Sequence, residues 1–529
     1  MRELNRTDSL CPECLKRIPA TIFERDGKIW IEKTCPEHGR IEDLYWGSYE
    51  MYERARRFAH EGRIIENPNI SKSNPTCPED CGLCNIHINH SALANMVITN
   101  RCDRACWYCF FYAAKSGHVY EPTLEQIREM FRSIRREKPV PCNAVQLTGG
   151  EPTLRDDLVE IIRIGKEEDV DHVQLNTDGI RLATDPGLAI RVRKAGVNTV
   201  YLSFDGTTPE TNPKNHWEIP SALENCRSAG LGIVLVPTII NTMNDGEVGN
   251  IVRFAFENID VVRGVNFQPV SLVGRISNAE RQKLRITIPD VILRLEEQTN
   301  GEIARDDFYP VPSIAPFSHF VEALTGEAEY ELGSHFACGM ATYIFKDDSK
   351  LVPITRFVDI DGLLVYLEEK ADQLRSGRNR YLVGLELLSK LGKFIEKSRQ
   401  PKGLSLSKVL YNAFLRHDYE ALGDFHHKAL FIGLMHFQDL YNYDIERVKR
   451  CNIHYTSPDG RIIPFCAFNV IPEWYRDKIQ EQYGIPIPEW ERRTGRKLVD
   501  DLYRRDVPKQ EVEPKKKTVE LLAATRTSL

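Results

Sequence analysis

Between Asn95 and Gln268, short runs with strand character alternate with amphipathic stretches of helical period. The strand-like runs lie at 95–99, 144–148, 172–176, 199–204, 233–238 and 264–268. The first helical stretch begins with a capping signal, because Thr123 precedes an apolar face and Gln126 stands three residues later. Six such units predict an α/β domain whose parallel strands form a partial (βα)6 barrel.

On either side of this region the pattern changes, and the 529-residue chain is too long for one core. We predict five segments: a metal-knuckle module at 1–65, an auxiliary iron-sulfur segment at 66–94, the partial barrel at 95–285, a mainly helical carboxy-terminal cluster-binding domain at 286–503, and a disordered tail at 504–529. The stretches Tyr381 to Lys397 and Leu406 to Tyr443 are apolar and predicted helical. Ordinary core packing explains them, and an apolar substrate tunnel is the alternative.

Charge and hydropathy narrow the class of protein. The formal net charge is −6, which offers no electrostatic footprint for a nucleic acid. The longest apolar run, Leu231 to Ile240, contains Pro237 and is too short to span a bilayer. The first residues contain no apolar stretch typical of a secretory signal. The chain is therefore expected to be cytoplasmic and to bind no nucleic acid.

The chain has 14 cysteines, and most of them are clustered. In a large cytoplasmic protein such clusters indicate metal binding rather than disulfides. Twelve of the cysteines fall into four sets of three, at positions 11/14/35, 77/81/84, 102/106/109 and 338/451/466. The remaining two, Cys142 and Cys226, are predicted to pack in the core, since a free cysteine buries readily.

The first set stands in two short knuckles, Cys11-Pro-Glu-Cys14 and Cys35-Pro-Glu-His38. Between them, strands are predicted on both sides of a turn at Asp26-Gly27. Two knuckles supply four ligands to one tetrahedral ion, with His38 as the fourth. The spacing favours zinc, and a rubredoxin-like mononuclear iron is the alternative.

Two further sets are candidates for auxiliary [4Fe–4S] clusters. Cys77, Cys81 and Cys84 have a C-x3-C-x2-C spacing, and no second barrel follows them. Cys338, Cys451 and Cys466 stand on predicted strand and turn segments that are far apart in sequence. A fourth ligand is not evident for either set.

The remaining set has the same spacing and directly follows the first predicted barrel strand. Cys102, Cys106 and Cys109 can hold three corners of a [4Fe–4S] cluster, which normally takes four cysteines, so one iron stays open. Tyr108 can flank a ligand of that iron. A zinc site or three buried cysteines would be the plain alternative. The second barrel strand ends in Thr148-Gly149-Gly150-Glu151-Pro152, in which glycines admit a ligand and a carboxylate suits an ammonium group.

Together these motifs resemble the radical S-adenosylmethionine (SAM) superfamily. The resemblance implies that the open iron chelates the methionine part of SAM, and that an electron from the cluster cleaves SAM to methionine and a 5′-deoxyadenosyl radical. It also implies that Gly149, Gly150 and Glu151 bind the amine of SAM. Polar residues at later strand ends would contact the rest of the cofactor, although each also suits an ordinary turn. They are Asn176, Ser203, Asp205 and Gln268.

The order of motifs along the whole chain is similar to that of the archaeal tetraether lipid synthases. It comprises CPEC…CPEHG, CPEDCGLC, the cysteine triad, QLTGGEPTLRDDL and the late cysteines. The resemblance implies three [4Fe–4S] clusters, one rubredoxin-like iron, and C–C coupling between terminal methyl carbons of isoprenoid diether phospholipids. It further implies a low-potential electron donor such as ferredoxin and peripheral contact with the inner face of the membrane.

A second hypothesis is a radical SAM methylase of a pterin, which shares the barrel and the additional clusters. A third is a metal-binding scaffold without catalysis, which the intact triad and GGEP motif argue against. The shape of the cavity discriminates between the first two. A long tunnel lined by Leu, Phe and Met would favour a lipid, and a compact polar pocket would favour a pterin.

Overall fold

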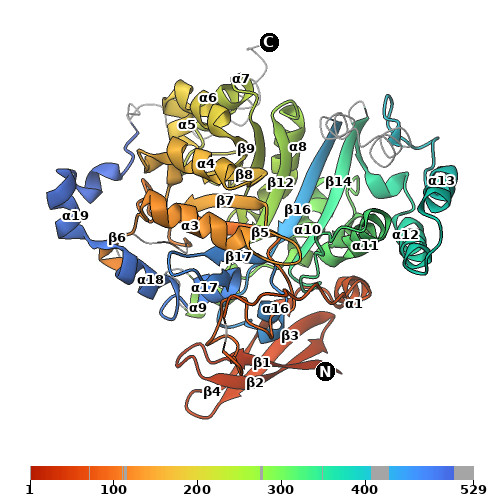
Figure 1. Cartoon of the computed structure of the whole chain (residues 1–529), viewed down its shortest axis with the longest axis horizontal. Helices are drawn as coiled ribbons and strands as arrows, with labels where there is room; N and C mark the ends of the chain where they lie inside the picture. The colour runs from red at the N-terminus through yellow and green to blue at the C-terminus, as the bar shows by residue number, and fades with distance from the viewer. Residues whose placement is uncertain are drawn as a thin grey trace.

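The computed structural model describes residues 2–505 except 71, 110, 112–115, 274–277, 348–349 and 407–427. A small antiparallel sheet at the amino terminus lies beside a large mixed sheet whose outer face is covered by helices (Figure 1). The tail predicted at 504–529 lies outside the described residues from 506 onward.

Six parallel strands with intervening helices form the centre of the large sheet, as the sequence pattern predicted. The strands are β5 (Leu93–Thr99), β7 (Ala144–Gly149), β8 (His172–Thr177), β9 (Val197–Ser203), β10 (Gly232–Val236) and β12 (Val262–Pro269). The helices are α3 (Leu124–Arg135), α4 (Leu158–Glu167), α5 (Ile180–Thr184), α6 (Pro186–Ala195), α7 (Ile219–Ser228) and α8 (Val248–Glu257). The predicted capping box of Thr123 and Gln126 is present at the start of α3. The α/β class and the partial barrel are confirmed.

Carboxy-terminal strands extend this parallel set at both edges. β16 (Ala429–Met435) pairs in parallel with β12, and β17 (Ile453–Thr456) pairs in parallel with β5. β14 (Gly339–Asp347) then pairs antiparallel with β16. Among the described strands the ends of the sheet do not pair with each other, so the barrel stays open.

The strand β16 replaces part of a predicted helix. The sequence analysis placed Leu406 to Tyr443 in helices, but 429–435 is a strand, and 407–427 lies outside the described residues. The segment ALFIGLM is apolar throughout, and a short apolar run cannot be assigned to strand or helix by periodicity. The segment is a strand because it pairs with β12 on one side and with β14 on the other.

The amino-terminal module is an antiparallel meander. Its strands are β1 (Arg2–Leu10), β2 (Arg17–Arg25), β3 (Lys28–Cys35) and β4 (Gly39–Trp46). The predicted turn at Asp26 and Gly27 is present, and both residues have positive φ, as a tight hairpin turn requires. Buried hydrogen bonds from Thr7 and Tyr45 to Asp444 attach the meander to the carboxy-terminal region.

A separate helical core lies at the far side of the large sheet (Figure 1). It contains α11 (Ala315–Thr325), α12 (Ile360–Arg375) and α13 (Arg380–Leu391). The buried face of α13 consists of Val383, Leu387 and Leu391, which pack in this core. Ordinary packing therefore accounts for this face of the 381–397 stretch, whereas Tyr381, Leu382 and Leu385 on the same helix are exposed.

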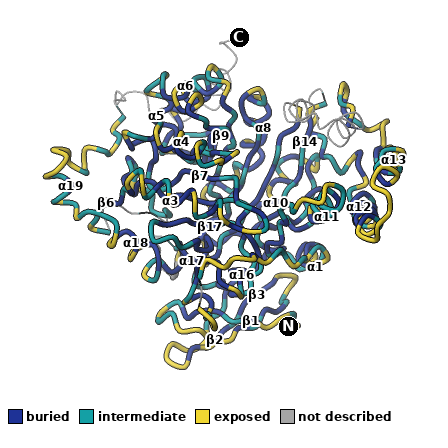
Figure 2. Tube along the Cα trace, in the orientation of Figure 1, coloured by how far each residue is buried: buried dark blue, intermediate teal, exposed yellow. Residues whose placement is uncertain are grey.

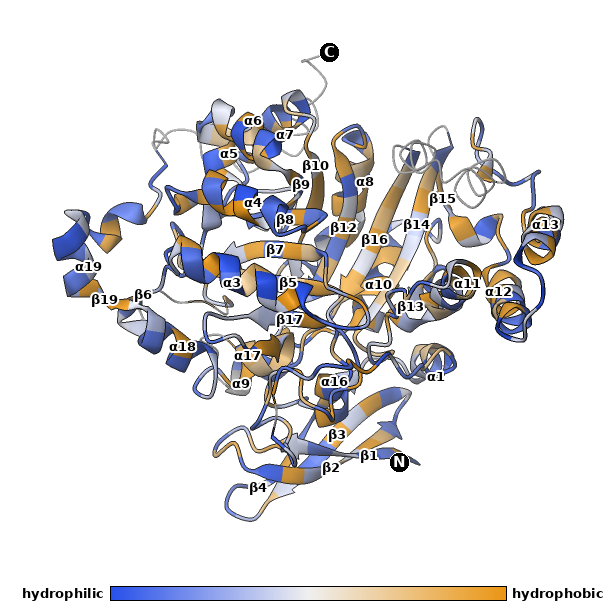
Figure 3. Cartoon of the chain, viewed as in Figure 1, coloured by the Kyte–Doolittle hydropathy of each residue, from blue (hydrophilic) through white to orange (hydrophobic). Residues whose placement is uncertain are grey.

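The remaining elements are short. The strands are β6 (His118–Val119), β11 (Thr238–Ile239), β13 (Tyr309–Pro310), β15 (Lys350–Pro353), β18 (Ile462–Pro464) and β19 (Ile485–Pro486). The helices are α1 (Tyr49–Arg56), α9 (Asn278–Leu284), α10 (Ile288–Gln298), α16 (Ile445–Lys449), α17 (Phe465–Val470), α18 (Arg476–Tyr483) and α19 (Ile487–Thr494). The central strands are the most continuously buried part of the chain (Figure 2), and β16 is strongly hydrophobic (Figure 3).

A buried carboxyl after α3 predicts a pH-dependent stability. Burial raises the pKa of Glu137 from 4.5 to about 7. The backbone N–H of Ser91 donates to its Oε2 at 2.9 Å, and its Oε1 has no partner among the described residues. Between pH 4.5 and 7 the folded state holds a proton that the unfolded chain has lost, so stability falls as the pH rises through that window.

We therefore expect Glu137→Gln to raise the free energy of unfolding by about 1–3 kcal/mol at pH 8 and to flatten its decline between pH 5 and 7. Denaturant titrations at several pH values measure this. Glu129→Gln, on the exposed face of α3, is the control and should leave the profile unchanged. Equal pH profiles for wild type and Glu137→Gln would contradict the assignment.

Candidate functional site

A cavity of about 270 Å³ opens at the carboxyl ends of the barrel strands. Parallel sheets present their loops and ligand sites at this end. Every residue that the sequence analysis assigned to the SAM site except Asp205 lines the cavity. These are Cys102, Cys106, Tyr108, Cys109, Gly149, Gly150, Glu151, Asn176, Ser203 and Gln268. Asp205 contacts the cavity through Tyr108, whose hydroxyl donates to its carboxylate at 2.5 Å.

The cysteine triad occupies the loop that follows β5. Burial raises the pKa of the Cys106 thiol and that of Cys109, the latter to about 11. Free thiols in this position would stay protonated at neutral pH. A bound metal reverses that preference, because it binds the thiolate. Three buried thiols that face one cavity therefore fit an iron-sulfur cluster.

The two glycines of the GGEP motif pack directly on the backbone that leads to the triad. The N–H of Gly150 donates to the carbonyl of Thr99 at 2.9 Å, and that of Glu151 donates to Arg101 at 2.7 Å. A Cβ at Gly149 would lie 1.9 Å from the Thr99 oxygen, and one at Gly150 would lie 2.0 Å from the Arg101 oxygen. No side chain fits at either position. The two glycines therefore allow the GGEP loop to pack directly against the loop that carries the triad.

Buried carboxyls lie beside the triad. Glu151 accepts from the backbone N–H and hydroxyl of Thr153, at 3.0 and 2.6 Å. Burial and the neighbouring Asp178 raise the pKa of Glu151 to about 7. Burial and the adjacent Asp103 raise the pKa of Asp178 to about 8. A cation placed among these carboxyls would relieve the cost of ionising them, as the ammonium group of SAM would.

Lys214 is a site residue that the sequence analysis missed. Its ammonium group lies 2.6 Å from Asp205 Oδ2, 2.5 Å from Ser203 Oγ and 3.2 Å from the Tyr108 hydroxyl. The side chain is only 10% exposed and lines the cavity. Lys214 lies in the long loop after β9, where no periodicity or motif marks it.

The floor of the cavity carries amide side chains that were also missed. Asn95, Gln146 and Asn266 line it from β5, β7 and β12. Asn95 and Gln146 pair in register, and Gln146 Nε2 donates to Asn95 Oδ1 at 3.0 Å. Polar residues within otherwise apolar buried strands are the sequence signal that could have found them.

Aromatic residues from the carboxy-terminal region form another wall. Phe437 stacks on Phe465 with ring centroids 3.8 Å apart, and Tyr455 lies 5.3 Å from Phe465. All three line the cavity. The cavity is therefore compact, with amides on one side and flat apolar rings on another.

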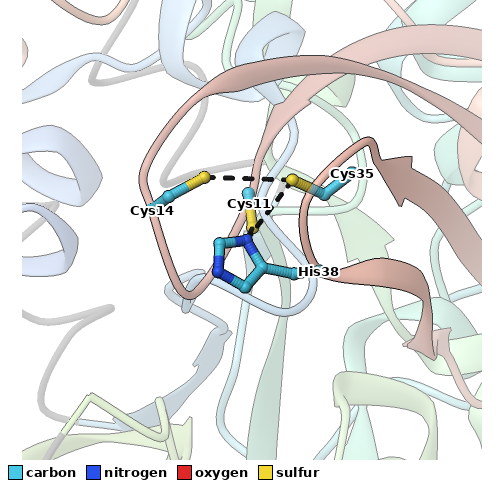
Figure 4. Close-up of side chains that lie close together, drawn as sticks. All are labelled: Cys11, Cys14, Cys35 and His38. Atoms are coloured by element: carbon cyan, nitrogen blue, oxygen red, sulfur yellow. Dashed lines mark hydrogen bonds between the residues drawn. The ribbon is translucent and has the colours of Figure 1, made fainter.

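The amino-terminal knuckles form a preassembled metal site (Figure 4). Nδ1 of His38 lies 3.5 Å from the sulfurs of both Cys11 and Cys35, and the Cys14 sulfur lies 3.9 Å from that of Cys35. The backbone N–H of Glu37 lowers the pKa of Cys35 to about 6, which favours the thiolate. Three sulfurs and one imidazole nitrogen are a common ligand set of structural zinc.

The structure also brings together each of the two auxiliary cysteine sets. The neighbouring Cys77 thiol and burial raise the pKa of Cys81 well above its ordinary value. Burial raises the pKa of Cys466 to about 11, and the nearby Cys338 contributes to the rise. Thiols within each set therefore influence one another, and the two further clusters stay predictions.

A buried positive charge, that of Arg447, lies beside the 338/451/466 set. Its guanidinium is buried, and its Nε donates to the Cys338 sulfur at 3.3 Å. Among the described residues it has no carboxylate partner within salt-bridge distance. A buried cation beside three thiols fits an anionic cluster, since an unpaired buried charge is costly.

The comparisons with known proteins identify the class first. Residues 96–255 match the radical SAM superfamily, and residues 3–47 match the domain described as the HMPTM N-terminal zinc ribbon domain. With the cavity described above, the chain is a radical SAM enzyme, a class that uses SAM and a [4Fe–4S] cluster.

The family follows from a relative that matches nearly end to end. The chain is 47% identical over 498 residues to 7,8-dihydro-6-hydroxymethylpterin dimethyltransferase of Methanocaldococcus jannaschii, covering 92% of this chain and 97% of that protein. The chain belongs to the family of this enzyme. A GTP 3′,8-cyclase of Clostridium acetobutylicum is 26% identical over 41% of this chain and 64% of its own length. The structure of methylornithine synthase (PylB) covers 40% of this chain and 63% of its own, with 18% identity and a TM-score of 0.30.

The predicted kinship with tetraether lipid synthases is therefore wrong, as are the lipid-coupling reaction and the isoprenoid lipid partner. The cysteine sets and the GGEP motif were matched as cofactor motifs, which both hypotheses share, so they could not separate the two hypotheses. The cavity is compact and carries amide groups, whereas the lipid hypothesis required a long apolar tunnel. Within the described residues no helix has the length and apolar character needed to cross a membrane.

Proposed function

We propose that this protein is a radical SAM methyltransferase that acts on a reduced pterin. The observation that carries the proposal is the near end-to-end similarity to a pterin dimethyltransferase at 47% identity. The pterin methylase was the second hypothesis from the sequence.

The cavity supports a planar heterocyclic substrate. A pterin presents ring nitrogens, an amino group and a carbonyl along one edge, and amide side chains offer both donors and acceptors to such an edge. Asn95, Gln146 and Asn266 supply them, and Phe437 and Phe465 supply flat apolar surface for the ring faces.

The cofactor residues have distinct tasks in this proposal. Bound SAM, reduced through the cluster, supplies a radical able to abstract hydrogen from a carbon that carries no acidic proton. Cys102, Cys106 and Cys109 hold the cluster, and Glu151 with Asp178 accepts the ammonium group of SAM. Lys214 holds Ser203 and Asp205 in place at the opposite side of the cavity.

The remaining metal sites are assigned by their ligands. We assign zinc to Cys11, Cys14, Cys35 and His38, in place of the rubredoxin-like iron implied by the lipid synthases. We assign auxiliary [4Fe–4S] clusters to the 77/81/84 and 338/451/466 sets. Tyr443 packs in one buried cluster with Cys77, Cys81 and Cys466, and burial and these thiols raise its pKa.

Product analysis tests the function. The chain is produced in cells, which supply the reductant and the methyl donor. The pterins of these cells are then analysed by mass spectrometry. We expect 6-hydroxymethylpterin derivatives heavier by one or two methylene units, absent from cells producing Cys106→Ala. Unmethylated pterins in both cultures, despite cluster-loaded protein, would reject the proposal.

A substitution in the floor tests substrate recognition. Asn266→Leu replaces the amide by an apolar group of similar size. We expect KM for the pterin to rise by about 10–100-fold, because losing the hydrogen bonds of the amide costs about 1–3 kcal/mol of binding free energy. Cleavage of SAM without substrate should stay unchanged. Asn250→Leu, on the exposed face of α8, is the matched control. An unchanged KM would remove Asn266 from the substrate site.

A further inference from the structure

A cluster of metal-binding side chains lies outside the barrel, and the proposed function does not use it. His60 follows α1, His319 lies on α11, and Glu331 lies in the segment after α11. One possible ligand atom of each lies within 4.8 Å of those of the other two. The imidazole rings meet edge to face with centroids 5.0 Å apart, and His60 Nε2 lies 3.2 Å from Glu331 Oε2. We propose that these three side chains bind a divalent transition-metal ion of the zinc class.

Neighbouring residues orient the ligands as they do in known metal sites. Glu368 on α12 lies 2.7 Å from Nδ1 of His319, which leaves Nε2 as the nitrogen available to an ion. Arg63 donates to Oε1 of Glu331 at 2.8 Å, on the oxygen that does not contact His60. Ligating imidazoles typically donate their other nitrogen to a carboxylate, and ligating carboxylates are themselves hydrogen-bonded.

The donor set selects the class of ion. Two imidazole nitrogens and one carboxylate are ligands for zinc and similar first-row metals. Calcium and magnesium prefer sites built from oxygen alone. Three protein ligands leave a fourth tetrahedral position for water.

Charge and access also suit a cation. Glu322, Glu329 and Glu368 lie around the cluster in addition to Glu331, against the cations Arg63 and Arg375. The acidic groups therefore outnumber the basic ones. The side chains of His60 and His319 are 28% and 15% exposed, so an ion can enter from solvent.

The other close histidine pair of the described chain shows what a purely structural arrangement looks like. His87 and His454 are fully buried, with their Nε2 atoms 3.1 Å apart. His87 Nε2 also lies 2.7 Å from the Cys451 carbonyl, and His454 Nδ1 lies 2.9 Å from the Ser91 hydroxyl. Protein groups that are not candidate ligands occupy these nitrogens. In the cluster around His60, the partner of His60 Nε2 is Glu331, which is itself a candidate ligand.

An ion at this position would connect two parts of the chain. His60 belongs to the connector between the amino-terminal sheet and the barrel, and His319 and Glu331 belong to the helical region around α11. Figure 1 shows α1 beside α11 at this junction. The ion would fasten the connector to the helical core.

Metal content tests the site directly. Cluster-loaded protein is equilibrated with Zn²⁺ and passed over a desalting column, and zinc per chain is determined by elemental analysis. We expect wild type to retain one zinc ion more than His319→Gln and Glu331→Gln. This difference holds whichever metal occupies the amino-terminal site. X-ray absorption should show that the zinc lost has nitrogen and oxygen ligands at about 2.0–2.1 Å rather than sulfur at about 2.3 Å.

The controls separate a metal site from a hydrogen-bonded contact. His172→Gln, at the opposite end of β8 from the cavity, should retain as much zinc as wild type. Added Zn²⁺ should raise the thermal midpoint of wild type and of His172→Gln by more than that of Glu331→Gln, which keeps only the amino-terminal site. Glu331→Gln keeps the size of the side chain, so it serves if His319→Gln does not fold. Equal zinc in wild type and Glu331→Gln would overturn the proposal and leave a salt-bridge network.

Discussion

Replacement of Cys106 by alanine is expected to abolish the reductive cleavage of SAM. The thiol lines the cavity between Cys102 and Cys109, and no other cysteine lines it. With only two thiols the cluster loses a corner, so about four irons per chain should be lost. Formation of 5′-deoxyadenosine should fall at least about 10³-fold, since enzymes commonly supply 10⁶-fold or more over the uncatalysed reaction. Chromatography of anaerobic reactions and iron analysis measure both quantities.

Cys226→Ala is the matched control. Cys226 is fully buried in α7 and belongs to none of the four cysteine sets. This substitution removes a thiol that lies in the core instead of the cavity, and we expect its iron content and SAM cleavage to equal those of wild type. Cleavage that persists in Cys106→Ala would show that the triad does not hold the cluster.

Replacement of Gly150 by alanine is expected to disable the site by a different route. The new Cβ would meet the Arg101 carbonyl oxygen at 2.0 Å, and backbone cannot move aside cheaply. Overpacking of this kind costs about 1–3 kcal/mol. Because this contact joins the GGEP loop after β7 to the triad loop after β5, a shift of about 1 Å between the two loops should reduce SAM cleavage about 10²-fold.

The expected signature differs from that of the cysteine variant. Gly150→Ala keeps all three thiols, so its iron content should stay close to that of wild type while SAM binding weakens, as followed by electron paramagnetic resonance of the reduced cluster. Gly384→Ala is the control, because no atom lies within 4 Å of its added Cβ in α13. Wild-type SAM affinity in Gly150→Ala would refute the close-packing argument.

The barrel could be predicted from the sequence because the patterns that indicate it are local. Alternation of strand and helix periods, the cap at Thr123 and the turn at Asp26-Gly27 each depend on a few neighbouring residues. β16 could not be read this way, since an apolar run takes its conformation from its neighbours. The same holds for β17, which pairs with a strand more than 350 positions earlier.

The residues of the cofactor site also fall into a group that the sequence predicts and a group that it does not. Cysteine spacing and the GGEP motif are contiguous, so the residues around the triad were predictable. Lys214 and Asn266 belong to no contiguous motif, and only the association of the strands into one sheet brings them to one cavity. The substrate was misassigned for this reason: the motifs that were matched are cofactor motifs, whereas the other residues that line the cavity are scattered over many strands.

The sequence by itself determined the radical SAM class, the four cysteine sets and the six central strands, because these depend on short-range spacing and period. Only the tertiary structure decided which of the scattered polar and aromatic side chains share the cavity. Residues far apart in the chain meet when apolar strands associate to bury their surface, and that association places Asn95, Asn266 and Phe437 around one small space.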